Sequence, residues 1–265
     1  MSVRLLTDID DTLMSTGRKV PEALRAVVGA VAPNGEPSSF QTPKQRMLWD
    51  LFVKAADSIV PVSARSPKAL ARMALPMKDG AIADFGATVL HADGSVDQGW
   101  YAQMQKLAAK REFGDIKFFE MLASFIEGSA PTEVKVELRA IEGMAAFVNF
   151  RGAPGSAPAV RESVEIFMAV HVPLTDYYLH VTDRDVTVLP SFVSKCRAAA
   201  YLIEQRGWQN DLLLGAGDSL SDSPFLAGLD FALLPTNSRA FKALMGVVGQ
   251  QGQMPTIASP LNAVI

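Results

Sequence analysis

Three aspartates lie within four positions near the start of the chain, in the stretch Thr7-Asp8-Ile9-Asp10-Asp11-Thr12. They directly follow a mostly apolar run over residues 3–6, a pattern typical of a buried strand. Side chains two positions apart on an extended segment point the same way, so Asp8 and Asp10 can converge on one ligand. A hard cation such as Mg²⁺, together with a phosphate group, would offset the concentrated negative charge. A polar turn or a helix cap after a strand explains this stretch, taken alone, equally well.

Polar and charged side chains recur where other apolar stretches end. Ser63 follows one such stretch, Asp218 and Asp222 follow another, and Lys195 stands at the start of a predicted helix. Each has an ordinary structural explanation, as a helix cap, a capped turn or a solvated lysine. In an open α/β sheet, however, ligands bind at the carboxyl ends of the strands, near the point where the strand order reverses. As an ordered set, these residues could compose a complete phosphoryl-transfer site.

The elements that must position these side chains alternate between strand and helix patterns on both sides of the chain's middle. Helical spacing over residues 21–32 predicts a first helix, and the Pro-, Gly- and Ser-rich residues 33–42 predict a loop. The remaining predictions for these two regions are a helix over 43–57, a strand over 58–62, a helix over 67–75, strands over 81–85 and 87–90, a helix over 194–205, strands over 211–215 and 231–234, and a last helix from 237 to about 247. This rhythm predicts an α/β fold with a parallel, doubly wound sheet of the Rossmann-like kind. Residues 249–265 show little pattern.

The middle of the chain has a different rhythm. Two helical patterns between residues 98 and 127 precede two alternating strands, over 133–139 and 145–151, and a second helix over 156–170 precedes a hairpin over 177–189. Helix, strand, strand, repeated once, predicts an antiparallel sheet with helices on one face. We interpret residues 96–188 as a small α+β domain inserted into a core made of residues 1–95 and 189–265.

Composition excludes several classes of protein. A chain of 265 residues can bury an ample core, and a net charge of −3 gives no basic footprint for nucleic acid. The single cysteine, Cys196, excludes an intrachain disulfide framework, and no uninterrupted apolar run approaches the ~18 residues of a membrane span. We therefore expect a soluble cytoplasmic protein with neither a nucleic-acid nor a membrane partner, while its oligomeric state stays open.

Together the motifs resemble those of the haloacid-dehalogenase-like superfamily. The residues that carry the resemblance are Asp8-Ile9-Asp10-Asp11-Thr12, Ser63, Lys195 and Gly217-Asp218-Ser219-Leu220-Ser221-Asp222. The inserted domain resembles the type II cap of the branch that holds sucrose-phosphate, trehalose-phosphate and mannosylphosphoglycerate phosphatases and phosphomannomutases. Two positions depart from the pattern, because Asp11 stands where the family often has glycine and Ser221 where this branch often has asparagine.

The resemblance implies a role for each motif residue. Asp8 would be the nucleophile that forms an aspartyl-phosphate, and Asp10 would first protonate the leaving group and then activate water. Ser63 and Lys195 would bind the phosphoryl oxygens.

The same resemblance implies a Mg²⁺ cofactor. The carboxylates of Asp8 and Asp218 and the backbone carbonyl of Asp10 would hold the ion. Asp222 would not bind the ion directly but would orient a metal-bound water or the phosphate-binding lysine.

Other charged residues give weaker signals. Arg65 could contact substrate, although an arginine at a helix start is more often a surface or cap group. His91, His171 and His180 lack metal-ligand spacing. Lys135, Arg139, Arg151 and Arg184 could meet an anionic substrate in the inserted domain, and a solvated sheet edge explains them equally well.

The favoured function is a Mg²⁺-dependent phosphatase that acts on a small phosphorylated metabolite, with sugar phosphates as the leading class. A cap that closes over the site suits a small substrate and argues against phosphoprotein or nucleic-acid substrates. A phosphomutase, which uses the same two aspartates, is the alternative among enzymes. A binding or regulatory module that keeps the fold without turnover is the alternative outside them.

Overall fold

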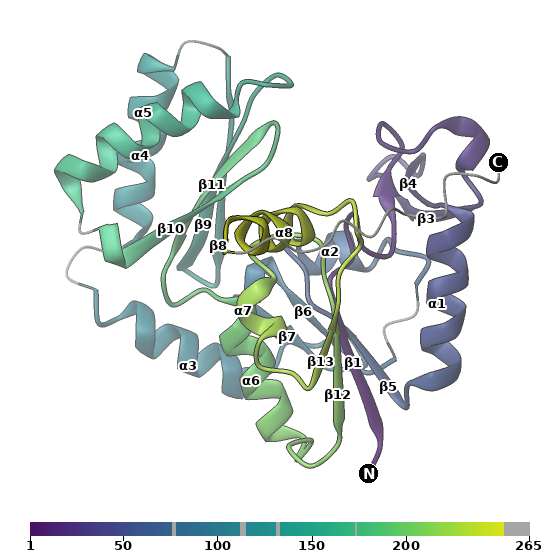
Figure 1. Cartoon of the computed structure of the whole chain (residues 1–265). Helices are drawn as coiled ribbons and strands as arrows, with labels where there is room; N and C mark the ends of the chain where they lie inside the picture. The colour runs from purple at the N-terminus through teal and green to yellow at the C-terminus, as the bar shows by residue number, and fades with distance from the viewer. Residues whose placement is uncertain (76–77, 112–114, 131–132, 173, 252–265) are drawn as a thin grey trace.

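The computed structural model of the chain describes residues 1–75, 78–111, 115–130, 133–172 and 174–251. Two four-stranded sheets dominate it, one parallel and one antiparallel (Figure 1). Residues 252–265, most of the tail that shows little pattern in the sequence, lie outside the described residues. None of the described helices has the length and apolar character needed to cross a bilayer.

The parallel sheet has the strand order β13-β12-β1-β5. Its strands are β1 (Val3–Thr7), β5 (Ser58–Pro61), β12 (Leu212–Ala216) and β13 (Phe231–Leu233). A parallel bridge from Val62 to Ile82 extends it to β6 (Ala81–Ala83), which pairs antiparallel with β7 (Thr88–Leu90). The predicted α/β fold with a parallel sheet is therefore confirmed.

Helices cover both faces of this sheet because its strands are apolar on both sides. On β5, Val60 packs in the cluster that contains residues of α6 (Lys195–Gln205), whereas Ile59 packs against the cluster that contains Trp49 of α1 (Pro43–Ala55). Such burial on two faces is typical of parallel strands. The other helices of this region are α2 (Pro67–Leu70), α3 (Gln98–Ala108), α7 (Ser223–Leu226) and α8 (Arg239–Gln251).

The antiparallel sheet has the strand order β10-β11-β9-β8 and carries two helices on one face (Figure 1). Its elements are β8 (Lys135–Ile141), β9 (Met144–Arg151), β10 (Tyr177–Val181), β11 (Asp185–Pro190), α4 (Asp115–Ser129) and α5 (Ala157–His171). On β9, Val148 and Phe150 face the helices, whereas Met144 and Ala146 join the core of the parallel sheet. The two sheets therefore share a continuous apolar contact.

The sequence prediction was wrong between residues 21 and 42. The expected helix over 21–32 and loop over 33–42 are instead a 3-10 turn, η1 (Glu22–Leu24), and a small antiparallel sheet, β2-β4-β3. Its strands are β2 (Ser15–Thr16), β3 (Val27–Val31) and β4 (Pro37–Gln41). Apolar residues at 24, 27, 28 and 31 mimic helical spacing, but β-branched valines fit a strand, and Gly35, with φ of 86°, closes the hairpin.

Candidate active site

The site lies where the order of the parallel sheet reverses. The chain leaves β1 for β5 on one side, and β12 later pairs with β1 on the other. Thr7 and Ala216 are register partners, and the amide of Asp8 donates to the carbonyl of Ala216 at 2.8 Å. The loops that carry Asp8 and Asp218 therefore leave adjacent strands at the same edge, which is the usual ligand site of such sheets.

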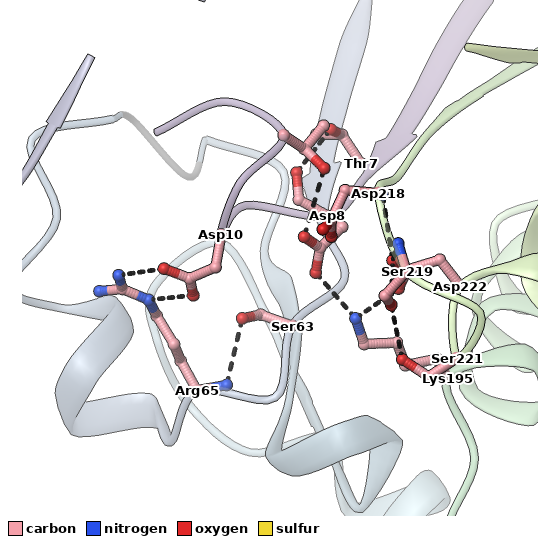
Figure 2. A network of polar contacts seen from close by, with 11 residues as sticks. Thr7, Asp8, Asp10, Ser63, Arg65, Lys195, Asp218, Ser219, Ser221 and Asp222 are labelled. Carbon is pink, nitrogen blue, oxygen red and sulfur yellow. Dashed lines mark hydrogen bonds and ion pairs between the residues drawn. The ribbon is translucent and has the colours of Figure 1, made fainter. Parts of the chain in front are cut away.

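Lys195 joins two of the predicted site residues directly. Its Nζ donates to Oδ1 of Asp8 at 2.8 Å and to Oδ1 of Asp222 at 2.7 Å (Figure 2). Although burial works to lower it, the two carboxylates hold the pKa of Lys195 above its ordinary value. The lysine is therefore a buried, charged group with two anionic partners.

A helix cap and a close backbone contact hold the start of α6, where Lys195 lies, beside the site. The hydroxyl of Ser194 caps the helix by accepting from the amide of Arg197 at 3.4 Å. Gly86, with φ of 100°, packs so closely that a Cβ there would lie 2.3 Å from the carbonyl oxygen of Ser194. Only glycine allows this approach, so the turn after β6 helps to hold the helix start beside the site.

Asp222 is buried, and every oxygen of its carboxylate is occupied. Its Oδ1 accepts from Lys195, while its Oδ2 accepts from the amides of Ser219 at 3.0 Å and Asp218 at 3.3 Å and from the hydroxyl of Ser219 at 2.7 Å. Burial works against ionisation, but Lys195 and Ser219 hold the pKa of Asp222 below its usual range. A Cβ at Gly217 would lie 2.8 Å from the Cβ of Asp222, so glycine is needed for this loop to fold onto the aspartate.

Three carboxylates form a group that could hold a cation. Oxygens of Asp8, Asp218 and Asp222 lie within 4.8 Å of one another. Burial, with Asp222 and Asp11 nearby, raises the pKa of Asp218 to about 7, and burial also raises the pKa of Asp8 against the pull of Lys195. Burial disfavours the charged form of both carboxylates, so a further positive charge would stabilise them as anions, and oxygen donors suit a hard divalent ion.

Within this group, the carboxylates that remain available to a cation are identified by the hydrogen bonds that each one already makes. Among the described residues, the carboxylate of Asp218 makes no hydrogen bond and no ion pair, whereas that of Asp222 is fully engaged. Oδ2 of Asp8 is available for a cation, because its one hydrogen bond among the described residues is a long one, from the hydroxyl of Thr12 at 3.4 Å. The residues present therefore fit Mg²⁺ bound through Asp8 and Asp218.

Asp10 points away from that group. Arg65 holds its carboxylate through two bonds, Nε to Oδ2 at 2.8 Å and Nη2 to Oδ1 at 2.7 Å (Figure 2). The same guanidinium donates to the hydroxyl of Ser39 in β4 at 3.2 Å. Only the backbone carbonyl of Asp10 was expected at the metal, so the direction of its side chain agrees with that expectation. From the sequence, Arg65 was expected to be a surface or cap group more often than a substrate contact, although its position two residues after Ser63 places it in the same loop.

Ser63 and Asp11 lie in the loops near the site, and each makes contacts of its own. Ser63 is buried, and its hydroxyl accepts from the amide of Arg65 at 3.1 Å. The described contacts do not join it to Asp8 or Lys195. Asp11 has φ of 64°, the left-handed conformation that favours glycine, and its carboxylate pairs with Lys19. Aspartate tolerates this conformation better than most residues, so the departure noted at this position is accommodated.

A cavity of about 580 Å³ opens beside Lys195, between β10 and the core. Phe85 and His180 both line it and are in edge-on contact, with ring centroids 5.1 Å apart. Burial and the charge of Lys195 lower the pKa of His180 to about 4. The cavity is of the size of ordinary small-molecule sites, roughly 300–1,000 Å³.

Compared by sequence, the chain matches no protein-family model and no curated protein. Compared by structure, it is similar to the sucrose-phosphatase of Synechocystis sp. PCC6803, with a TM-score of 0.57 at 13% identity, covering 95% of this chain and 98% of that chain. It is also similar to the C-terminal domain of the C. albicans trehalose-6-phosphate phosphatase, with a TM-score of 0.57 at 14% identity, covering 97% and 80%. A haloacid dehalogenase-like hydrolase from B. subtilis gives a TM-score of 0.53 at 10% identity, covering 92% and 93%. The protein therefore has the haloacid-dehalogenase-like fold, as its motifs indicated.

Proposed function

We propose that the protein is a Mg²⁺-dependent phosphatase of the haloacid-dehalogenase type that hydrolyses a small phosphorylated metabolite. One observation carries the proposal: Lys195 bridges Asp8 and Asp222, while the carboxylate of Asp218 lies within 4.8 Å of both aspartates with no partner among the described residues. In this proposal residues 96–188 form a cap over a core of residues 1–95 and 189–265, and the first helix of the cap segment, α3, packs on the core through Trp100.

Asp8 is the nucleophile. Its carboxylate attacks phosphorus, the bond to the leaving oxygen breaks, and an aspartyl-phosphate forms. Asp10 gives a proton to the leaving oxygen and then takes one from the water that hydrolyses the intermediate. The two bonds from Arg65 set the direction in which the Asp10 carboxylate points.

The cations of the site bind the phosphoryl group. Lys195 has three N–H donors, of which Asp8 and Asp222 take two, so one remains for a phosphoryl oxygen. The hydroxyl of Ser63 supplies a second donor, and Asp222 keeps the lysine charged and in place. When bound at Asp8 and Asp218, Mg²⁺ would shield the repulsion between the anionic nucleophile and the anionic phosphoryl group.

Sugar phosphates are the leading substrate class. Two proteins with the same fold are, by name, a sucrose-phosphatase and a trehalose-6-phosphate phosphatase. The cavity between the proposed cap and the core has room for a small leaving group, and a closed roof would exclude polymers. Cytoplasmic location belongs to the same proposal.

A screen of phosphorylated metabolites for Mg²⁺-dependent phosphate release tests the function, with p-nitrophenyl phosphate as a general substrate. Asp8→Asn should lower turnover by at least about 10³-fold, as removal of a catalytic nucleophile does. Asp50→Asn, at an exposed aspartate on α1, is the matched control and should retain activity. Release that needs an added bisphosphate would indicate a mutase instead. No hydrolysis by the intact fold would indicate a binding module, and an active Asp8→Asn would exclude the covalent route.

A further inference from the structure

The cavity beside Lys195 has an unbalanced set of polar groups. Within the described part of the chain, its lining contains no aspartate, glutamate, asparagine or glutamine. Its polar lining residues are Arg161, His180, Lys195 and Arg239, together with Tyr178, Ser191, Ser194, Ser219 and Ser221. Arginine and lysine are positively charged and can only donate hydrogen bonds, so the cavity has cationic groups and no anionic one among the described residues.

Two of these cations have hydrogen-bonding capacity left for a ligand. Nη1 of Arg239, at the start of α8, donates to the carbonyl of Val181 at 2.9 Å, and no carboxylate of the described residues lies within ion-pair distance of it. Among the residues that the structure describes, the one ion-pair partner of Arg161 is Glu165, one turn along the same helix, and both side chains are about half exposed. Such an exposed pair contributes little and exchanges readily for a better anion.

Arg161 and Arg239 come from different parts of the fold. Arg161 belongs to α5 above the antiparallel sheet, and Arg239 belongs to α8 of the core, so a ligand between them would contact both. Planar guanidinium groups bind carboxylates and phosphates through two parallel bonds. A neutral sugar could bond to the serine hydroxyls of the lining, but it would bring no negative charge to the two guanidinium groups.

The remaining wall is apolar and aromatic. Phe85 lies edge-on to His180, at 5.1 Å, and to Phe147, at 5.4 Å. Its φ of 58° is unusual for a bulky residue, and such strain is often found at functional sites. This wall suits the carbon skeleton of a small ligand.

We infer that the leaving group of the substrate carries a negative charge of its own, a carboxylate or a second phosphate, which Arg161 and Arg239 bind. This inference rests on the proposed phosphatase activity, because Lys195 joins the cavity to the phosphoryl site. The substrate class is then a phosphorylated hydroxy acid, a sugar acid phosphate or a bisphosphate, rather than the ester of a neutral sugar.

Matched pairs of esters test the inference. We expect kcat/KM to be at least about tenfold higher for 3-phosphoglycerate than for glycerol 3-phosphate, and for 6-phosphogluconate than for glucose 6-phosphate, as a charge-assisted contact provides. A comparison of kcat/KM for fructose 1,6-bisphosphate and fructose 6-phosphate tests whether a second phosphate supplies the negative charge. A preference for the carboxylate esters alone would identify the bound group as a carboxylate. A preference for the bisphosphate alone would identify it as a second phosphate.

Two variants test the residues. Arg161→Gln and Arg239→Gln should each reduce the preference for the anionic ester several-fold, chiefly through KM. The matched control is Arg46→Gln, because Arg46 pairs with Asp50 across one exposed turn of α1 as Arg161 pairs with Glu165. Equal kcat/KM for charged and neutral esters, or an unchanged preference in both variants, would overturn the inference.

p-Nitrophenyl phosphate separates this failure from failure of the proposed function. If it is hydrolysed and the anionic preference is absent, only the inference fails. If it is not hydrolysed, calorimetric binding of 3-phosphoglycerate and glycerol 3-phosphate still tests the cavity. Tighter binding of the former, weakened by Arg161→Gln, would support the anion site, and equal binding would reject it.

Discussion

Lys195 is the residue whose removal has the clearest energetic consequence. It is a buried cation between two buried carboxylates, and removing one partner of such a group typically costs about 3–5 kcal/mol because the other charges stay behind. Lys195→Met should therefore lower the free energy of unfolding, at pH 7 without metal, by about 3 kcal/mol, measured by urea denaturation. It should also abolish phosphate release.

The double variant Lys195→Met, Asp222→Asn provides the control for that prediction. It removes the uncompensated charge of Asp222 along with the lysine, so part of the lost stability should return while activity does not. A single variant as stable as the parent would show that the three groups are not coupled as their distances indicate.

Asp218 leads to a prediction that joins pH and metal. Its pKa in the folded chain is about 7, raised from 3.8 by burial and by Asp222 and Asp11. The native state therefore binds more protons than the unfolded state between these values, and stability is lost as the pH rises through about 7. Mg²⁺ that binds the ionised form should raise Tm much more at pH 8 than at pH 5.5, as a thermal melt would show.

Asp218→Asn should reverse both effects. Without metal at pH 8 the variant should melt above the parent, by roughly 2–4 °C for each kcal/mol of relieved charge, and its response to Mg²⁺ should be largely lost. A metal response that is equal at both pH values, or retained in Asp218→Asn, would place the cation elsewhere.

At the scale of elements, the small sheet β2-β4-β3 was not predicted from the sequence, yet it contacts the candidate site. Through Ser39 it contacts Arg65, and Arg65 in turn holds Asp10. Arg65→Lys keeps the charge but loses the planar fork that grips both carboxylate oxygens. We expect kcat to fall roughly 10–100-fold with a smaller change in KM, because a misplaced acid–base group costs turnover.

Arg46→Lys is the matched control for Arg65→Lys. Arg46 also grips an aspartate, Asp50, through two nitrogens, but on the exposed face of α1. Its replacement should leave kcat unchanged. If the two variants have equal kcat, the fork of Arg65 does not orient Asp10 for turnover.

What the sequence could predict depends on the range of the interactions involved. Buried strands with acidic ends, such as the one before Asp8, are local patterns, and the order of strands and helices then brings the ends together. β3 escaped prediction because four apolar positions satisfy helical spacing, and its pairing with β4 decides the outcome. The ion pair of Arg65 with Asp10 joins residues 55 positions apart, which no local pattern specifies.

At the scale of the whole molecule, a chain of contacts runs from the antiparallel sheet to Asp10. Arg139 of β8 donates to both carboxylate oxygens of Asp84 at 3.0 Å. The amide of Asp84 donates to the carbonyl of Arg65 at 2.8 Å, and the side chain of Arg65 holds Asp10. From the sequence, Arg139 could equally contact an anionic substrate or lie at a solvated sheet edge, and the structure places it in a contact between the two sheets.

The strength of this contact follows from the burial of Asp84. Its side chain is fully buried, and Asp84 and Phe85 both have positive φ, at 50° and 58°, a strained conformation that the surroundings must hold. Arg139→Met leaves the Asp84 carboxylate without its cation, so we expect unfolding in urea to need about 3 kcal/mol less. Arg151→Met, at a half-exposed arginine that pairs with Asp185 in the same sheet, should cost at most about 1 kcal/mol.

Activity distinguishes a purely structural contact from one that also positions the site. If Arg139 helps to set the Arg65 loop, Arg139→Met should lower kcat for p-nitrophenyl phosphate, a substrate too small to need the anion-binding cavity. Adding Asp84→Asn removes the buried charge, so the double variant should recover stability but not kcat. Recovery of both stability and kcat in the double variant would mean that Arg139 only compensates the charge of Asp84. If Arg139→Met is no less stable than Arg151→Met, the two sheets are held together by their apolar contact alone.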